Sequence, residues 1–226
     1  MIQRLFRKMR LISSDASIKS FHQLERSSPL YSQLAVKCGE CREQLRPVYE
    51  GYVRDVSSAN MAASLELGAL LLALCRINRW HRLLDLGSGF SSYVFRLYAK
   101  ENPGVVVYSV DDDPVWLKRT ASFLSEHQLS TERLLWLDDF LRESTQPFDC
   151  ILHDLNFVEV RIHHVEDVLS RLATNGLAIF DDAHKQDYRS ALVKTLHSTG
   201  GSTYGLKPLT MDQFGRYALA FVPKAK

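Results

Sequence analysis

Leu83-Leu84-Asp85-Leu86-Gly87-Ser88-Gly89-Phe90-Ser91-Ser92, residues 83–92, is the stretch that decides how this chain is interpreted. An apolar run leads into an acidic residue and two closely spaced glycines, and a segment with helical character, residues 92–100, follows directly. This order predicts a buried strand, a tight turn whose backbone can touch a ligand, and a helix N-terminus behind the turn. One such turn is weak evidence for a binding site, so the rest of the chain must support it.

Strands and helices alternate on both sides of this turn. We expect an apolar helix over 60–77 before the first strand at 83–86, and later helices over 92–100, 114–127, 158–173 (ending at Asn175-Gly176) and 184–199, with a short helix near Phe140. The expected later strands are 105–110, 134–137, 150–152, 177–180, 203–209 and 216–222, the last two joined by a turn near Asp212. This alternation predicts a mostly parallel sheet covered on both faces, with ligands bound beyond the carboxyl ends of its strands.

Length and composition favour one α/β domain with an N-terminal addition. The chain has 226 residues, of which 46% are hydrophobic and 24% charged, and a net charge of +2, which implies no strong attraction to nucleic acid. We place the main domain at residues 58–226 and an extension of short helices at 1–57, because Ser27-Ser28-Pro29 and Arg46-Pro47 punctuate that part. The longest apolar run, 67–75, is far short of the roughly 20 residues that a membrane span needs.

The first ten residues, Met1 to Arg10, carry four basic and no acidic side chains among apolar ones. This spacing predicts an amphipathic helix, for which packing on its own domain is favoured over contact with an anionic membrane surface. No apolar stretch follows that would make a secretory signal, so we expect a cytoplasmic protein. Four cysteines, with Cys38 and Cys41 at a zinc-knuckle spacing that lacks a second pair, are expected to be reduced structural thiols.

Acidic residues follow all five central strands. They are Asp85, the run Asp111-Asp112-Asp113, the pair Asp138-Asp139, Asp154, and the pair Asp181-Asp182. Asp113 precedes Pro114 and is typical of a helix N-cap, and one of Asp138 and Asp139 could cap the next turn. Carboxylates massed at one edge of a sheet repel one another unless something offsets their charge. The pattern therefore favours a ligand that carries a positive charge.

The turn fits a dinucleotide poorly. A pyrophosphate fingerprint places a third glycine three residues after Gly89, where this chain has Ser92, and a ring of acids would repel a pyrophosphate. An acid about 20 residues beyond the glycines, Asp111, is placed to accept hydrogen bonds from ribose hydroxyls. A carboxylate at Asp138 or Asp139 could accept from an exocyclic amine, and Asp85 from a cationic group. S-adenosylmethionine has a ribose, an adenine amine and a positive charge.

These residues resemble the class I S-adenosylmethionine-dependent methyltransferases over roughly residues 58–222. The resemblance implies a Rossmann-like, doubly wound α/β fold: a mostly parallel seven-stranded sheet with a reversed C-terminal hairpin and an N-terminal helical extension. It also implies that the backbone around Gly87 and Gly89 holds the methionine part, Asp111 the ribose, and Asp138 or Asp139 the adenine. The expected cofactor-binding set is Asp85, Gly87, Ser88, Gly89, Ser91, Asp111, Asp112, Asp138, Asp139 and Asp154.

Within that family the chain is most similar to small-molecule O-methyltransferases of the catechol and caffeoyl-CoA type. Those enzymes place a divalent metal on one Asp after strand four and on an Asp-Asn pair after strand five. Asp154 matches the first position, but the pair is Asp181-Asp182 here, and Leu155-Asn156-Phe157 stands where those enzymes carry a lysine. The resemblance therefore leaves the metal as an option that we do not favour.

A hydroxyl acceptor must lose its proton, for which a base is needed if no metal lowers the hydroxyl pKa. We expect the catalytic residues to be Asp154, Asp181, Asp182 and His184, with His184 as the preferred base because it starts a helix at the expected mouth of the site. His153 is expected to face the sheet packing. His163 and His164, which stand mid-helix among Arg161 and Glu166, are expected to be solvated.

The sequence thus predicts methyl transfer from S-adenosylmethionine to a small molecule, at a hydroxyl oxygen. The expected partner is that small molecule, not nucleic acid, and a homodimer is left open. A nucleic-acid methyltransferase, a non-catalytic nucleoside-binding domain and a dehydrogenase remain alternatives. The first is disfavoured because His153-Asp154-Leu155-Asn156 replaces an Asn/Asp-Pro-Pro-Tyr-like segment and no basic stripe lies beyond the first ten residues.

Overall fold

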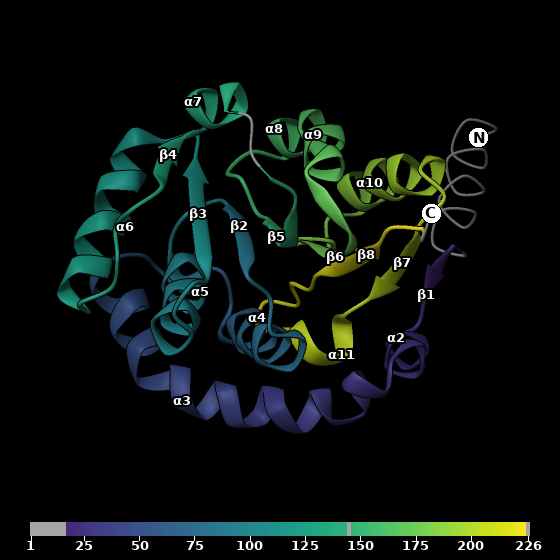
Figure 1. The fold of residues 1–226 in the computed structure, drawn as a ribbon, viewed down its shortest axis with the longest axis horizontal. Coiled ribbons are helices and arrows are strands. Elements are labelled where there is room, and N and C mark those ends of the chain that lie inside the picture. Colours follow the sequence, from purple (N-terminus) through teal and green to yellow (C-terminus); the bar gives the residue numbers. More distant parts are fainter. Residues whose placement is uncertain (1–16, 144–145, 225–226) are drawn as a thin grey trace.

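The computed structural model describes residues 17–143 and 146–224. Its centre is an eight-stranded sheet in the order β1-β7-β8-β6-β5-β2-β3-β4 (Figure 1). The strands are β1 (Ile18–Lys19), β2 (Arg82–Leu86), β3 (Val106–Asp111), β4 (Leu134–Trp136), β5 (Phe148–His153), β6 (Leu172–Phe180), β7 (Ser202–Gly205) and β8 (Leu219–Val222). The helices are α2 (Phe21–Ser27), the 3₁₀ helix η1 (Pro29–Gln33), α3 (Leu34–Asp55), α4 (Leu65–Asn78), α5 (Phe90–Glu101), α6 (Pro114–Glu126), α7 (Leu137–Arg142), α8 (Val158–His163), α9 (Val165–Ser170), α10 (Gln186–Ser198) and α11 (Lys207–Thr210).

The predicted parallel sheet covered on both faces is confirmed. Strand β2 lies in its middle and pairs in parallel with β3 on one side and β5 on the other. Adjacent residues of β2 enter different cores: Leu83 packs with α3, α4 and α5, whereas Leu84 packs with α9 and α10. Because both faces are buried, the central strands carry mostly apolar side chains, and the polar residues at or just after their carboxyl ends gather at one edge.

The last two strands form the predicted antiparallel hairpin, in which β8 alone, among the strands of the described residues, runs against the others. Strand β8 is antiparallel to both β6 and β7 and lies between them. The connection differs from the expected turn, because β7 ends at Gly205 and helix α11 follows before the chain returns. The hairpin of β7 and β8 completes the predicted seven-stranded sheet. Strand β1 is an eighth strand, which was not predicted from the sequence.

The N-terminal extension is more regular than the predicted short helices. Helix α3 runs for 22 residues and contains Pro47, which the sequence analysis took as a break. Its buried residues Leu34, Cys38, Cys41 and Leu45 recur at helical spacing and pack against α4. This apolar stripe stabilises the helix through tertiary contacts, which outweighs the local cost of the proline.

Two other predicted elements were wrong in their bounds. The helix expected over 158–173 is two helices, α8 and α9, separated at His164. Its expected stop, Asn175-Gly176, instead lies within strand β6, which begins at Leu172 because that residue already pairs with Phe148 of β5. The helix expected from residue 60 begins at Leu65, where the Ser64 hydroxyl accepts a hydrogen bond from the Leu67 amide.

Three further expectations concern the N-terminus, membrane crossing and the cysteines. Met1 to Arg10, for which an amphipathic helix is expected, lies outside the described residues. Within residues 17–143 and 146–224, none of the helices combines the length and apolar character needed to cross a bilayer. All four cysteines are buried free thiols, which confirms that expectation.

Leu45→Ala tests whether α3 belongs to the same cooperative unit as the sheet. Leu45 is fully buried between α3 and the core, and Val36 on the same helix is 65% exposed. Truncation of Leu45 should lower the free energy of unfolding by about 2–5 kcal/mol, and Val36→Ala by less than about 0.5 kcal/mol. Urea denaturation followed by far-UV circular dichroism measures both. A separate early transition in Leu45→Ala, with the main one unchanged, would contradict a shared core.

Candidate functional site

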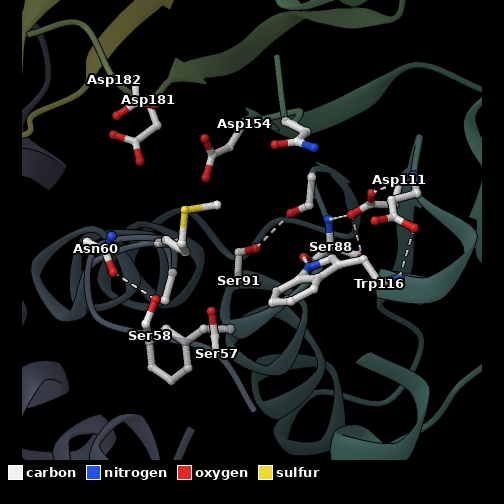
Figure 2. A pocket seen from close by; sticks show the side chains of 18 of the residues that line it. Ser57, Ser58, Asn60, Ser88, Ser91, Asp111, Trp116, Asp154, Asp181 and Asp182 are labelled. Atoms are coloured by element: carbon white, nitrogen blue, oxygen red, sulfur yellow. Dashed lines mark hydrogen bonds between the residues drawn. The ribbon is translucent and has the colours of Figure 1, made fainter. Parts of the chain in front are cut away.

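A cavity of about 630 Å³ lies at the carboxyl ends of the central strands. The turn after β2, the end of β3 and the start of α6 form one side, and the residues after β5 and β6 form the other (Figure 2). The C-terminal part of α3 and the segment that follows it contribute Tyr52, Val56, Ser57 and Asn60 to the wall. The cavity therefore lies where a parallel sheet of this kind is expected to bind ligands.

Both glycines of the turn are required by close packing. Gly87 has φ +104°, and a Cβ there would lie 2.1 Å from the Asp154 carbonyl oxygen of the neighbouring strand end. Gly89 has φ +153°, and a Cβ there would lie 2.7 Å from the Tyr52 hydroxyl oxygen. The glycines thus make room for the chain's own groups and bring the ends of β2 and β5 together at the cavity.

Asp85 lies behind the turn and does not line the cavity. Its carboxylate is fully buried and accepts hydrogen bonds from the Ser92 hydroxyl at 2.5 Å and the Ser109 hydroxyl at 3.1 Å. Burial raises its pKa to about 6. The structure therefore does not place Asp85 where it could accept from a bound cation; the residue connects β2 with α5 and β3 instead.

Asp111 reaches the cavity wall from the end of β3. One carboxylate oxygen accepts from the Ser88 amide at 2.7 Å and the Ser88 hydroxyl at 2.9 Å, and the other accepts from the Asp113 amide at 3.0 Å (Figure 2). Burial raises its pKa. Asp113 also lines the cavity and caps α6, as predicted, by accepting from the Val115 amide. Asp112 does not line the cavity.

Asp138 and Asp139 are not brought into the cavity. Strand β4 ends at Trp136, one residue earlier than expected, so both aspartates fall in the first turn of α7 and are exposed. Asp139 forms an ion pair with Arg142 one helical turn later. The structure therefore gives no support to the expectation that one of these carboxylates contacts an adenine.

Three carboxylates gather on the opposite side of the cavity (Figure 2). Asp154 follows β5, and Asp181 and Asp182 follow β6. Arg161 of α8 lies 2.8 Å from Asp154 and 3.1 Å from Asp182, measured between guanidinium nitrogen and carboxylate oxygen, and the Lys185 ammonium lies 2.6 Å from Asp182. We call Asp154, Asp181, Asp182 and Arg161 the acid–arginine cluster.

The three acids differ in their compensation. Burial acts to raise the pKa of Asp182, but Arg161 and Lys185 outweigh that effect and hold its pKa below the ordinary value. Asp181 forms no ion pair within the described part of the chain, and burial, reinforced by the charge of Asp182, raises its pKa to about 6. Asp182 also has φ +60°, a left-handed conformation that aspartate tolerates better than most residues.

The two histidines near these acids have different surroundings. His184 lines the cavity with its Nδ1 atom 3.5 Å from an Asp182 carboxylate oxygen, and burial lowers its pKa. His153 is fully buried and packs on Phe180 with 5.6 Å between ring centroids, so burial lowers its pKa to about 3. His153 therefore belongs to the sheet packing, as expected.

A divalent metal does not fit the acid–arginine cluster. A hard cation needs several oxygen ligands free to surround it, but a guanidinium already lies between Asp154 and Asp182. Across residues 17–143 and 146–224, no three His, Cys, Asp or Glu side chains are arranged to hold a metal ion.

Several cavity residues were not identified from the sequence. Arg161 was not singled out in the sequence, and only 4% of it is exposed. Trp116 presents its indole to the cavity and donates its ring N–H to the Ser88 carbonyl. Tyr52 comes from a helix assigned to the extension. Of these residues, only Trp116 could have been found from the sequence, because it lies in the first turn of the helix that follows Asp111.

The fold is similar to that of solved methyltransferase structures. One is the O-methyltransferase TomG from Streptomyces achromogenes, involved in tomaymycin synthesis and in complex with SAM (S-adenosylmethionine): TM-score 0.61, 17% identity, 83% of this chain and 90% of that chain covered. Another is an O-methyltransferase from Bacillus cereus in complex with SAH, with TM-score 0.63, 16% identity, and 81% and 90% covered. A third is the SAH-bound methyltransferase PaMTH1 from Podospora anserina, with TM-score 0.54, 14% identity, and 83% and 88% covered.

No protein-family model matches this sequence, and no curated protein is similar to it. At such low identities the structural matches establish the fold: a Rossmann-like methyltransferase fold, mostly parallel with an antiparallel C-terminal pair.

Asp85→Asn tests the burial of the Asp85 charge through the pH dependence of stability. The pKa of about 6 in the folded protein lies above the ordinary value of 3.8, so the folded state holds the proton more tightly than the unfolded chain. Ionisation of Asp85 therefore lowers wild-type stability as the pH rises from 4 to 6, a loss that the Asp85→Asn variant cannot show.

The stability of Asp85→Asn minus that of the wild type should increase from pH 4 to pH 6 and level off above. Guanidinium denaturation at five pH values measures this difference, in which the titration of other groups cancels. A difference independent of pH would contradict the assignment.

Proposed function

We propose that this protein transfers the methyl group of S-adenosylmethionine to a hydroxyl oxygen of a small molecule. The observation that carries the proposal is one cavity that joins the turn after β2 and Asp111 on one side to the acid–arginine cluster on the other. Its volume of about 630 Å³ lies within the usual range for small-molecule sites. The fold shared with O-methyltransferases in complex with SAM and SAH supports it.

The side of the cavity near Asp111 suits the nucleoside. Asp111 already accepts three hydrogen bonds from the protein, but an ionised carboxylate has about four acceptor sites, so its Oδ1 atom can accept one more from a ribose hydroxyl. Ser88, Ser91 and the backbone of the glycine turn would hold the methionine part. The Trp116 ring offers adenine a flat apolar surface, in place of the expected Asp138 or Asp139.

The side near the acid–arginine cluster suits the acceptor. Asn156, His184 and Lys185 line it from the loops after β5 and β6, and Val56 and Met61 add apolar surface from the segment after α3. We therefore assign residues 1–57 as a cap over the acceptor and residues 58–226 as the cofactor-binding domain. A small molecule is the favoured partner, because the cavity volume of about 630 Å³ lies within the usual range for small-molecule sites.

Bound S-adenosylmethionine supplies a methyl carbon on a positively charged sulfur. The protein must then align an acceptor oxygen and remove its proton. Among the three carboxylates of the cluster, Asp181 lacks an ion-pair partner in the described residues, and its pKa of about 6 suits a base that works near neutral pH. We therefore propose that Asp181 is the base that removes the proton of the acceptor hydroxyl. The sequence favoured His184 for this role.

Asp111→Asn tests the nucleoside side. Loss of the charged acceptor of a ribose hydrogen bond should weaken S-adenosylmethionine binding by about 10–100-fold, since a hydrogen bond to a charged group contributes about 1.5–3 kcal/mol. Isothermal titration calorimetry measures the affinity, and thermal melting confirms that the variant folds.

Asp138→Asn is the matched control and should bind like the wild type, because Asp138 is exposed outside the cavity. Equal affinities for wild type and Asp111→Asn would remove the ribose assignment. No binding by the wild type would remove the proposed function.

Asp181→Asn tests the base. With an acceptor found from a panel of phenols and other hydroxyl compounds, we expect kcat to fall by about 10²–10⁴-fold. Wild-type activity should rise with pH through an apparent pKa near 6, because the base must lose its proton, and this rise should be absent in Asp181→Asn.

His184→Gln serves as the comparison for the base assignment. It should retain the rise in activity near pH 6. If His184→Gln abolishes that rise and Asp181→Asn keeps it, the base is His184 and the assignment to Asp181 is wrong.

A further inference from the structure

Arg161 is a buried cation at the wall of the proposed acceptor side. Only 5% of its side chain is exposed, and its guanidinium bridges Asp154 after β5 and Asp182 after β6. Its Nε–H donates to the Leu155 carbonyl, and the Tyr188 ring lies 6.0 Å from its central carbon. Contacts on three sides hold the planar group in one orientation.

Charge explains why an arginine belongs there. Asp154, Asp181 and Asp182 lie close together at the edge of the sheet, and a buried carboxylate without a compensating charge is costly. In the O-methyltransferases that this chain resembles, a divalent metal compensates the acids at the corresponding positions. Here the guanidinium lies directly between two of those acids, and Lys185 adds a second cation against Asp182.

One nitrogen of the guanidinium has hydrogen-bonding capacity left. Nη1 lies 3.1 Å from Asp182 but makes no hydrogen bond to it, and it is a buried donor without a hydrogen-bond partner in the described part of the chain. Arg161 also lines the cavity. A charged N–H without a hydrogen-bond partner, on a side chain that lines a cavity, is a candidate donor for an oxygen of a ligand.

We propose that Arg161 is the resident cation of this site in place of a divalent metal, and that its Nη1 donates to an acidic hydroxyl oxygen of the acceptor, of the phenol class. A guanidinium beside such an oxygen stabilises its ionised form, as a metal would, without needing oxygen ligands. The statement about the acceptor rests on the proposed function, whereas the replacement of the metal does not.

Arg161→Met tests the replacement of the metal, with Mn²⁺ as the probe. The wild type should not bind Mn²⁺ at the cluster, and Arg161→Met should bind it at least tenfold more tightly, because, within the described residues, Asp154 and Asp181 then lack a cation and Asp182 keeps only Lys185. Electron paramagnetic resonance of free Mn²⁺ measures binding without S-adenosylmethionine or turnover. Arg119→Met removes another cavity arginine, one that forms no ion pair with these acids in the described residues, and should not gain affinity.

Two further variants keep this test decisive. Arg161→Lys retains a charge and should not gain Mn²⁺ affinity, and Asp154→Asn combined with Arg161→Met should lose the gained affinity. If Arg161→Met is unstable, Mn²⁺ should raise its melting temperature but not that of the wild type. Mn²⁺ affinity that is no higher in Arg161→Met than in the wild type would overturn the proposal.

The acceptor statement is tested with 4-nitrophenol in metal-free buffer. Bound to the wild type, its pKa, followed by the absorbance of the phenolate, should fall by about one unit, corresponding to a tenfold shift in the ionisation equilibrium. Arg161→Met should show no such fall. An equal fall in both proteins would overturn the role of Nη1. Failure to bind S-adenosylmethionine in the separate calorimetric titration would remove the proposed function but leave the Mn²⁺ result standing.

Discussion

Compensation of buried carboxylates governs the ligand-binding edge of this sheet. Burying a charge without a partner is costly, and most of the acids at this edge have one. Hydroxyl groups donate hydrogen bonds to Asp85, and the Ser88 amide and hydroxyl donate to Asp111. Arg161 forms ion pairs with Asp154 and Asp182. The acids were expected to need a cationic ligand, but the protein itself supplies much of the compensation. The acids alone therefore do not identify the ligand, and the proposed function rests on the arrangement of their partners.

That arrangement divides the cavity by chemistry. The groups that donate to Asp111 are neutral, so no cation of the described residues neutralises its carboxylate. Its remaining acceptor capacity is left for a hydroxyl group of a ligand. Across the cavity, cations neutralise Asp154 and Asp182 and leave Asp181 without an ion pair in the described residues. The close approach of Gly87 to the Asp154 carbonyl brings the two sides together. A nucleoside and an acidic acceptor are the pair of ligands that this division suits.

Local patterns predicted the parallel core, the antiparallel C-terminal hairpin and the Asp113 cap, because these features depend on residues that are neighbours in the sequence. What failed depended on contacts between distant residues. Helix α3 continues through Pro47 because α4 buries its apolar stripe. The end of β4 one residue early moved Asp138 out of the site. Arg161 lies between Val160 and Ile162 in the sequence, and only the fold shows that α8 places its guanidinium against Asp154.

A crystal structure of the protein soaked with S-adenosylmethionine and Mn²⁺ tests this account most directly. We expect the nucleoside beside Asp111 and Trp116, Arg161 still between Asp154 and Asp182, and no manganese among the three carboxylates. A manganese ion bound there with Arg161 displaced, or a nucleoside bound away from Asp111, would contradict it.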